Sequence, residues 1–230
     1  MGLRAVIFDL YGTLIDLFEW SDEQDVLARM ADILSLPAAE FQKTWTETYP
    51  ELVTGAFHDE VAYIGNLCDR LGAKPGDEKL SVALAIKHEF TSGLIIPRSD
   101  AEETLNRLRA AGLKLALLTN CSPEVPGYWN RTALAPLMDA AIFSFQVGCK
   151  KPDPRIYNLT CERLGVGPEE CVFVGDGGNR ELEAADEVGM TSIMIRTPED
   201  HIYNPRRTAS DGWAGRRIAH LMEVAEIAIR

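Results

Sequence analysis

The start of the chain carries the residues best suited to chemistry. Val6, Ile7 and Phe8 form an apolar run that predicts a short buried parallel strand, and Asp9 follows it directly. Open α/β sheets bind ligands at the carboxyl ends of their strands, so Asp9 is a candidate functional carboxylate. Gly12 lets the backbone turn sharply and approach a ligand closely. The alternative is that Asp9 caps the following turn, which aspartate commonly does.

Two further predicted strands end at polar residues, one at Thr119 and Asn120 and the other at Asp176. Between them in the chain lies Lys151, in a turn that the following prolines hold extended. The carboxyl ends of parallel strands share one edge of a sheet, so we expect these side chains near Asp9. Asp9 and Asp176 could then hold a divalent cation such as Mg²⁺ through hard oxygen ligands. Thr119 and Lys151 could bind a tetrahedral anion.

The elements that must position these groups alternate along the chain. Apolar runs predict strands over residues 6–8, 114–118, 140–145, 171–174 and 191–195. Helical patterns predict helices over residues 100–111, 154–164, 179–188 and 216–229. Strands that alternate with helices predict a parallel sheet with right-handed crossovers, which is a Rossmann-like α/β core.

One long segment interrupts this alternation directly after the first strand. It contains helical patterns punctuated by Pro and Gly, over residues 21–34, 38–53, 60–71 and 78–90. We therefore predict an inserted all-helical cap domain at 16–92, above Asp9, and a core domain at 1–15 and 93–230. Residues 198–215 are rich in Pro, Asn, Asp, Ser and Gly, which predicts a long surface loop.

Composition limits the function classes. The chain has 230 residues and a formal net charge of −12, which argues against binding nucleic acid or an anionic membrane. Five cysteines, an odd number without a CxxC pair, argue against a zinc site or a disulfide framework and favour the cytoplasm. Neither a signal peptide nor an apolar run of membrane-spanning length is evident. We expect a cytoplasmic monomer or homodimer that acts on a small molecule.

The chain resembles the haloacid dehalogenase superfamily of aspartate-nucleophile hydrolases, in its helical-cap subgroup. Four ordered motifs carry the resemblance and together span the predicted core. They are Asp9-Leu10-Tyr11-Gly12-Thr13, Leu118-Thr119-Asn120, Lys151-Pro152-Asp153-Pro154 and Val174-Gly175-Asp176. Four motifs in order are a far more specific signal than any one of them.

The resemblance implies a role for each motif residue. Asp9 would be the nucleophile and a metal ligand, while Thr119 and Lys151 would hold the anion as the other catalytic residues. Tyr11 would give its backbone carbonyl to Mg²⁺, and Asp176 would be the second acidic ligand.

One position departs from the phosphatase pattern. Tyr11, Gly12 and Asn120 are expected to contact the substrate. Phosphatases of this superfamily usually have a second aspartate at the position of Tyr11. That aspartate acts as general acid and base, and its loss typically costs ~10²–10⁴-fold in rate. Tyrosine there resembles the 2-haloacid dehalogenases, whose halide leaving group needs no proton.

The fourth motif favours a phosphatase over a dehalogenase. Asp176 would repel the carboxylate of a haloacid, whereas it could bind Mg²⁺ together with a phosphate. The resemblance implies that a dehalogenase also needs a cap arginine, but the corresponding stretch of the cap offers only Lys43. Arg29 and Arg70 are the possible substitutes, although charges of this kind usually lie on a solvated helix face.

Glu181 either faces the metal through a water or pairs with Lys151 or Arg180. We predict a Mg²⁺-dependent phosphatase of a small phosphorylated metabolite. The alternatives are a metal-free 2-haloacid dehalogenase and a catalytically degenerate member that binds a ligand.

Overall fold

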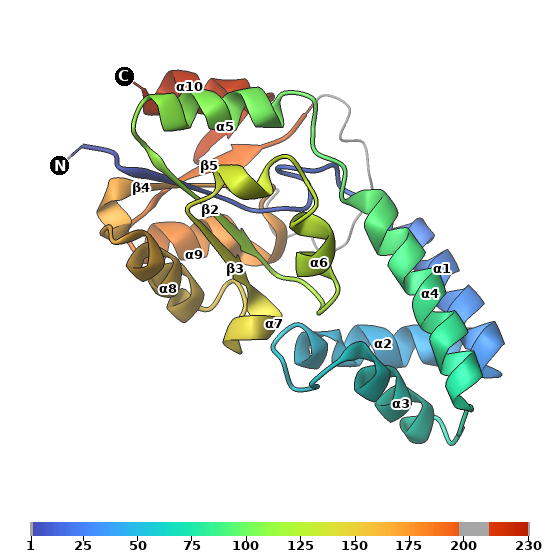
Figure 1. The fold of residues 1–230 in the computed structure, drawn as a ribbon. Coiled ribbons are helices and arrows are strands. Elements are labelled where there is room, and N and C mark those ends of the chain that lie inside the picture. Colours follow the sequence, from blue (N-terminus) through green and yellow to red (C-terminus); the bar gives the residue numbers. More distant parts are fainter. Residues whose placement is uncertain (1, 198–211, 230) are drawn as a thin grey trace.

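The computed structural model describes residues 2–197 and 212–229, which form a parallel sheet flanked by helices (Figure 1). Six strands lie in the order β3-β2-β1-β4-β5-β6 within these residues. They are β1 (Ala5–Phe8), β2 (Lys114–Thr119), β3 (Ala140–Phe143), β4 (Cys171–Gly175), β5 (Thr191–Ile195) and β6 (Arg216–Ile218). Strand β1 pairs with both β2 and β4. The carboxyl ends of these three strands are therefore neighbours.

Helices cover both faces of the sheet, which explains why β1 is a continuous apolar run. Val6 and Phe8 belong to the core under α5 (Ala101–Ala110) and α10 (Met222–Ala228). Ala5 and Ile7 belong to the core under α8 (Pro154–Leu164) and α9 (Glu181–Glu187). All four side chains are fully buried. Figure 1 shows α5 and α10 on one side of the strands and α8 and α9 on the other.

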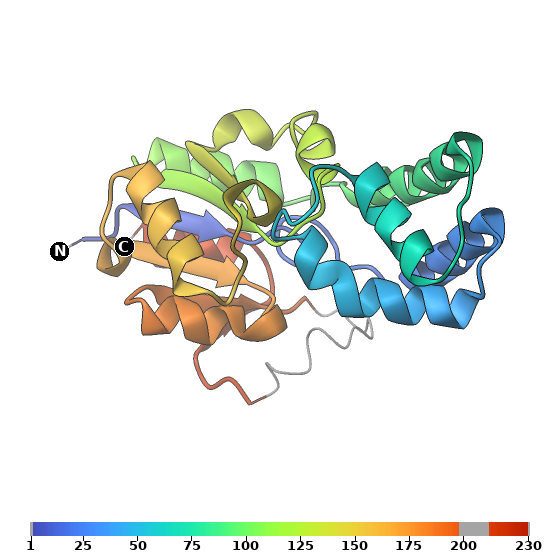
Figure 2. The ribbon, with the colours of Figure 1, turned by 90° about the horizontal axis from the view of Figure 1, so that it is seen from below.

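Four helices between β1 and β2 lie together at one end of the molecule (Figures 1 and 2). They are α1 (Trp20–Leu34), α2 (Ala38–Leu52), α3 (Glu60–Arg70) and α4 (Asp77–Leu94). Their buried side chains, Phe41, Trp45 and Tyr63 among them, form a hydrophobic cluster separate from the two under the sheet. Asp59 caps α3 by accepting a hydrogen bond from the Ala62 amide at 2.8 Å. The division into core and cap domains at residues 15/16 and 92/93 stays a prediction.

The segment that leaves the sheet after β1 and the segment that returns to it lie side by side. Arg98 holds the two segments together. The Arg98 amide donates to the Leu14 carbonyl at 2.9 Å, and its guanidinium donates to the Gly12 carbonyl at 3.2 Å. An ion pair to Asp16 at 3.3 Å adds a third contact. The turn that follows Asp9 is therefore held in place by the returning chain.

Parts of the expected element order are wrong. The predicted helix at 216–229 begins instead with strand β6 and only then forms α10, and the predicted strand at 140–145 ends at Phe143. Helix α9 begins at Glu181 because Asn179 and Arg180 have positive φ angles of 53° and 58°. Of the predicted loop at 198–215, residues 198–211 lie outside the described parts of the chain.

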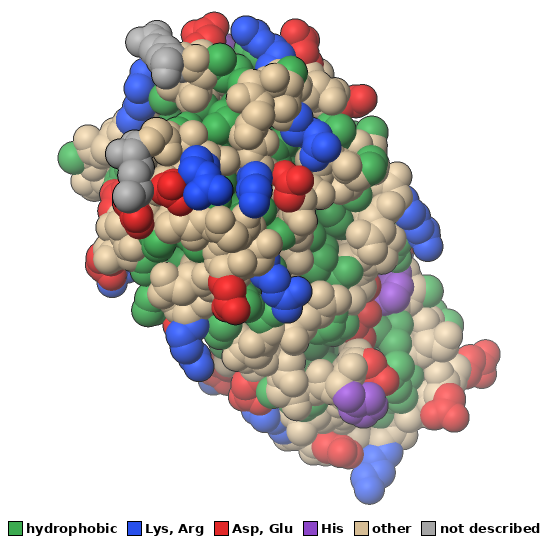
Figure 3. All heavy atoms as spheres, turned by 60° about the vertical axis from the view of Figure 1, so that its left-hand side comes forward, with side chains coloured by type: hydrophobic (Ala, Val, Ile, Leu, Met, Phe, Trp, Pro, Cys, Tyr) green, Lys and Arg blue, Asp and Glu red, His purple; other side chains and the backbone are tan. Residues whose placement is uncertain are grey.

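Short elements that the apolar pattern did not indicate complete the fold. These are α6 (Val125–Trp129), α7 (Ser144–Val147) and the 3₁₀ helices at Ala135–Leu137, Pro168–Glu170 and Gly178–Arg180. None of the helices in the described parts of the chain has both the length and the apolar character that a membrane span requires. On the face seen in Figure 3, Lys and Arg side chains lie interspersed with Asp and Glu.

Candidate active site

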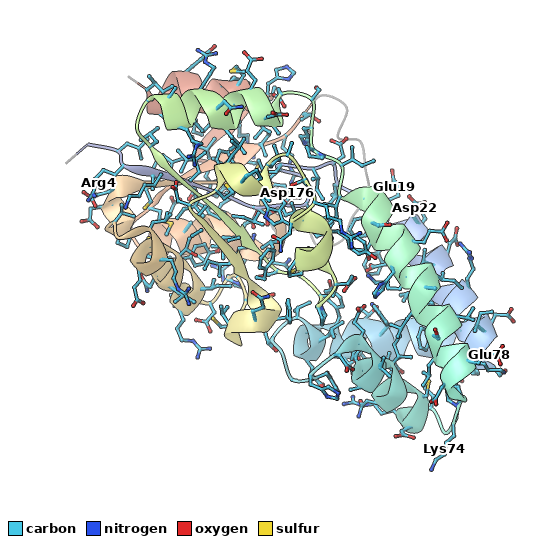
Figure 4. The ribbon with its side chains drawn as sticks, viewed as in Figure 1. Arg4, Glu19, Asp22, Lys74, Glu78 and Asp176 are labelled. Atoms are coloured by element: carbon cyan, nitrogen blue, oxygen red, sulfur yellow. The ribbon has the colours of Figure 1, made fainter. Side chains whose placement is uncertain are left out.

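The sheet order brings the predicted site residues to one edge. Asp9 follows β1, Thr119 ends β2 and Asp176 follows β4, and these three strands are neighbours in the sheet. Lys151 reaches the same place from the loop between α7 and α8. Figure 4 shows Asp176 near the middle of the molecule, whereas Lys74 lies at the far end of the helical part.

Three buried carboxylates lie together, and two of them pair with one buried ammonium group. An oxygen each of Asp9, Asp176 and Glu181 lie within 4.8 Å of one another. The Lys151 ammonium donates hydrogen bonds to Asp9 Oδ1 and, at 2.5 Å, to Glu181 Oε2. Glu181 pairs with Lys151, whereas Arg180 pairs with Glu187 at 3.6 Å. A contact of Glu181 with the metal through a water stays a prediction.

Burial and pairing act against each other on these groups. Burial raises the pKa of Asp9 and raises that of Glu181 well above its ordinary value, although Lys151 opposes both shifts. Burial lowers the pKa of Lys151, but the adjacent carboxylates of Asp9 and Glu181 outweigh it, and the net shift is upward. The two carboxylates therefore favour the charged form of Lys151.

The glycines around Asp176 make room for the acidic side chains. A Cβ atom on residue 175 would lie 2.3 Å from Glu181 Oε1 and 2.9 Å from the Phe173 ring, so any larger residue would displace these side chains. The Gly177 amide donates to Glu181 Oε1 at 3.0 Å, and the Gly178 amide donates to Asp176 Oδ1 at 2.8 Å. Both carboxylates are thus oriented by the backbone of the loop that carries them.

Asn120 holds the loop of Lys151. Its side-chain amide donates to the Lys151 carbonyl at 2.9 Å and accepts from the Lys151 amide at 2.8 Å. These reciprocal bonds join the end of β2 to the loop before α8. Asn120 also borders a cavity beside Asp9, so a contact with substrate stays a prediction.

Two threonines and a tyrosine lie in the turn after β1 and at the end of β2. The Thr119 and Thr13 hydroxyls are buried, and neither has a hydrogen-bond partner among the described residues. Tyr11 packs edge-on against Phe18, with ring centroids 5.9 Å apart, and burial raises its pKa well above the ordinary value. Gly12 takes a φ of 75° in the turn, where a side chain would be strained.

A cavity of about 220 Å³ opens between Asp9 and the helices α1, α2 and α4. Its walls include the aromatic side chains of Tyr11, Phe18, Tyr49 and Phe90. Asp176, Glu181 and Lys151 border it at the sheet edge. The three carboxylates and the lysine therefore face a space in which a small molecule fits.

Sequence reasoning missed a buried ion pair beside this cavity. The Lys87 ammonium donates to Glu124 Oε1 at 2.7 Å and to Thr91 Oγ1 at 2.6 Å. Burial raises the pKa of Glu124, but Lys87 outweighs it and the result is a pKa of about 2. The partners are 37 positions apart, and Lys87 and Glu124 resemble ordinary surface charges in the sequence. Only the spacing of Thr91, one helical turn after Lys87, is a local signal.

Comparison with known proteins now bears on this geometry. Residues 3–189 match the family model described as haloacid dehalogenase-like hydrolase. The chain belongs to the haloacid dehalogenase-like hydrolases. The resemblance of its four motifs is thus confirmed, and so are the hydrolase class and the α/β fold.

Two proteins that this family member resembles have different activities. It is 29% identical to the glyceraldehyde 3-phosphate phosphatase of Methanopyrus kandleri, over 89% of this chain and 88% of that one. It is also 29% identical to (S)-2-haloacid dehalogenase 4A of Burkholderia cepacia, over 89% of each chain. The solved structure of a HAD phosphatase from Thermococcus onnurineus covers 98% of this chain, with a TM-score of 0.66 and 25% identity. Overall similarity therefore leaves the choice between the two classes to the site.

Proposed function

We propose that this hydrolase is a Mg²⁺-dependent phosphatase that acts on a small phosphorylated metabolite through Asp9. One observation carries the proposal: oxygen atoms of the buried carboxylates of Asp9, Asp176 and Glu181 lie within 4.8 Å of one another. Buried carboxylates this close together repel one another, and a divalent cation bound between them would offset that repulsion. The donor set, all hard oxygen atoms, also suits Mg²⁺.

Asp9, Asp176 and the backbone carbonyl of Tyr11 would hold the ion. When bound, Mg²⁺ would reduce the repulsion between the anionic phosphate and these carboxylates. Glu181 would act on the site through its hydrogen bond to Lys151. The Thr119 hydroxyl, buried and without a partner among the described residues, is suited to donate a hydrogen bond to a phosphate oxygen.

The chain's own residues then account for the reaction. A carboxylate oxygen of Asp9 attacks phosphorus, so that a bond from phosphorus to Asp9 forms and the bond to the ester oxygen breaks. Lys151 orients Asp9 through its hydrogen bond to Oδ1. A water oxygen next attacks phosphorus, which releases inorganic phosphate and regenerates Asp9, while the proton of that water passes to solvent.

Position 11 limits which esters react well. Burial raises the pKa of Tyr11, so its hydroxyl is a poorer acid than an exposed tyrosine and far poorer than a carboxylic acid. The leaving oxygen must therefore take its proton from water. Esters of phenols, whose anions are stable, should react faster than esters of simple alcohols.

Dehalogenation of a 2-haloacid is the second candidate, and Tyr11 is the observation that favours it. Among the described residues, the helices that line the cavity offer little to the carboxylate of such a substrate. Lys87 lines the cavity, but it already donates to Glu124 and Thr91. Lys43 has 74% of its side chain exposed and lies 3.9 Å from Glu47.

One screen tests the proposal against this alternative. Para-nitrophenyl phosphate and 2-chloropropionate are each incubated with the protein, in Mg²⁺ and in a chelator. We expect phosphate release only with Mg²⁺, and none from an Asp9→Asn variant. Halide release in the presence of the chelator, without phosphate release, would instead establish the dehalogenase.

A further inference from the structure

Two buried cysteines lie in contact in the core under α8 and α9. Cys161 is in the last turn of α8 and Cys171 is the first residue of β4, and their sulfur atoms lie 3.7 Å apart. Both thiols are free. The other three cysteines also lie in described parts of the chain, and none of them has its sulfur in contact with that of another cysteine. A disulfide bond requires the two sulfur atoms to approach to about 2.05 Å.

Hydrogen bonds in the connection between α8 and β4 hold these two thiols beside each other. The Val166 amide donates to the Cys161 carbonyl at 3.1 Å, and the Cys171 thiol donates to the Gly167 carbonyl at 3.3 Å. The Glu170 carboxylate accepts a hydrogen bond from the Gly167 amide at 2.8 Å. The fold of this short connection therefore keeps the two sulfur atoms side by side.

We propose that Cys161 and Cys171 form a reversible oxidation site, at which hydrogen peroxide converts the two thiols into a disulfide that joins α8 to β4. The thiolate of one cysteine attacks a peroxide oxygen, which forms a sulfenic acid and releases one molecule of water. The sulfur of the other cysteine then attacks the sulfenic sulfur, so that the disulfide bond forms and a second water leaves. The thiols lose two electrons and two protons, and the peroxide takes up both. This inference is independent of the proposed phosphatase function.

The pair lies at the opposite end of β4 from the candidate active site. Cys171 begins this strand and Asp176 follows its last residue, so roughly 16 Å of extended chain separates them. Cys161 precedes the exposed residues Glu162 and Arg163, so the pair lies close beneath the surface. Hydrogen peroxide is little larger than water, which makes it the oxidant suited to buried thiols in this position.

Peptide mapping of the oxidised protein tests the inference directly. The reduced full-length protein is incubated with hydrogen peroxide, the remaining thiols are alkylated with N-ethylmaleimide, and the protein is digested with trypsin. Cleavage after Arg163 places the two cysteines on separate peptides, 156–163 and 164–180. We expect these peptides joined, two hydrogen atoms lighter than their sum, and separated again by dithiothreitol. Recovery of Cys161 and Cys171 alkylated, or as sulfinic acids, without the joined peptides would overturn the inference.

Thermal unfolding and matched variants assign the cross-link to this pair. The oxidised wild type should unfold about 5 °C higher than the same sample after dithiothreitol, because a cross-link restricts the unfolded chain. Cys171→Ala should lose both the joined peptides and this difference. Cys149→Ala should keep both, because Cys149 is buried in the same core but its sulfur contacts neither of the other two.

A difference in unfolding temperature that persists in Cys171→Ala, or that disappears in Cys149→Ala, would contradict the assignment. If the Cys171 variant does not fold, the peptides from the wild type alone decide for or against the oxidation site.

Discussion

Tyr11 stands two residues after the proposed nucleophile, at the position from which a carboxylate would protonate the leaving group. Replacing it by aspartate should raise kcat for an alkyl phosphate at least about tenfold, because an alkoxide cannot leave without a proton. An aryl phosphate, whose anion is stable, should gain much less. Steady-state kinetics with both esters and Mg²⁺ measure the difference. A lower kcat for both esters would contradict this role of position 11. If the protein is instead a dehalogenase, repulsion between the two carboxylates should lower the rate of halide release.

Asn120 is expected to work by position, because both atoms of its side-chain amide bond to the backbone of Lys151. Asn120→Ala should lower kcat/KM for an aryl phosphate roughly 10- to 100-fold, since small displacements of a catalytic group cost about that much. Asn106→Ala, on the exposed side of α5, is the control and should change nothing. A wild-type rate in the Asn120 variant would show that the loop holds Lys151 without this clamp.

The individual residues were predictable to different degrees. Asp9, Thr119 and Asp176 follow apolar strands, and parallel strands bring such positions together whatever the details of packing. The double hydrogen bond of Asn120 depends on the path of a loop 31 residues away, which no local pattern encodes. The pairing of Glu181 with Lys151 depends in the same way on how that loop folds.

Helix α4 is joined to the loop after β2 by the buried pair Lys87–Glu124. Lys87→Met should destabilise the protein by about 3–5 kcal/mol, because it leaves the Glu124 carboxylate buried without its cation. Adding Glu124→Leu should restore much of the loss. Lys43→Met, at an exposed pair, should cost no more than about 1 kcal/mol. Urea unfolding measures the free energy of unfolding of the wild type and of the three variants. A negligible loss for Lys87→Met would show that Lys87 does not neutralise Glu124.

Helices α3 and α4 meet at Glu60 and His88, whose side chains lie 2.8 Å apart. Burial, reinforced by Glu124, raises the pKa of Glu60 from 4.5 to about 7. The folded protein then binds a proton that the unfolded chain has lost, so stability should fall as pH rises from about 4.5 to about 7. The change is at most about 3 kcal/mol.

Glu60→Gln isolates this effect, because glutamine does not titrate. The difference in unfolding free energy between wild type and variant should shift against the wild type as the pH is raised through that range. Urea unfolding at both ends of the range measures it. A difference that is independent of pH would mean that Glu60 ionises as readily in the folded protein as in the unfolded chain.

Over the whole molecule, the sequence predicts the architecture better than the ends of its elements. Buried parallel strands are apolar throughout, so β1, β2, β4 and β5 are evident. Strand β6 is hidden because two of its three residues are exposed arginines, and its pairing with β5 is a tertiary effect. The cavity was not predictable at all, since its wall combines side chains from α1, α2 and α4 with the edge of the sheet.

The central claim is that phosphate is transferred to Asp9, and a rapid-quench experiment tests it most directly. The protein is mixed with an aryl phosphate and Mg²⁺, quenched in acid, digested and analysed by mass spectrometry. Without a carboxylate at position 11 to activate water, breakdown of the aspartyl phosphate should be slow. We therefore predict a burst of the phenol product and a phosphoryl group on the peptide that contains Asp9. Phosphate release without a burst, or a phosphoryl group found on another residue, would contradict the account.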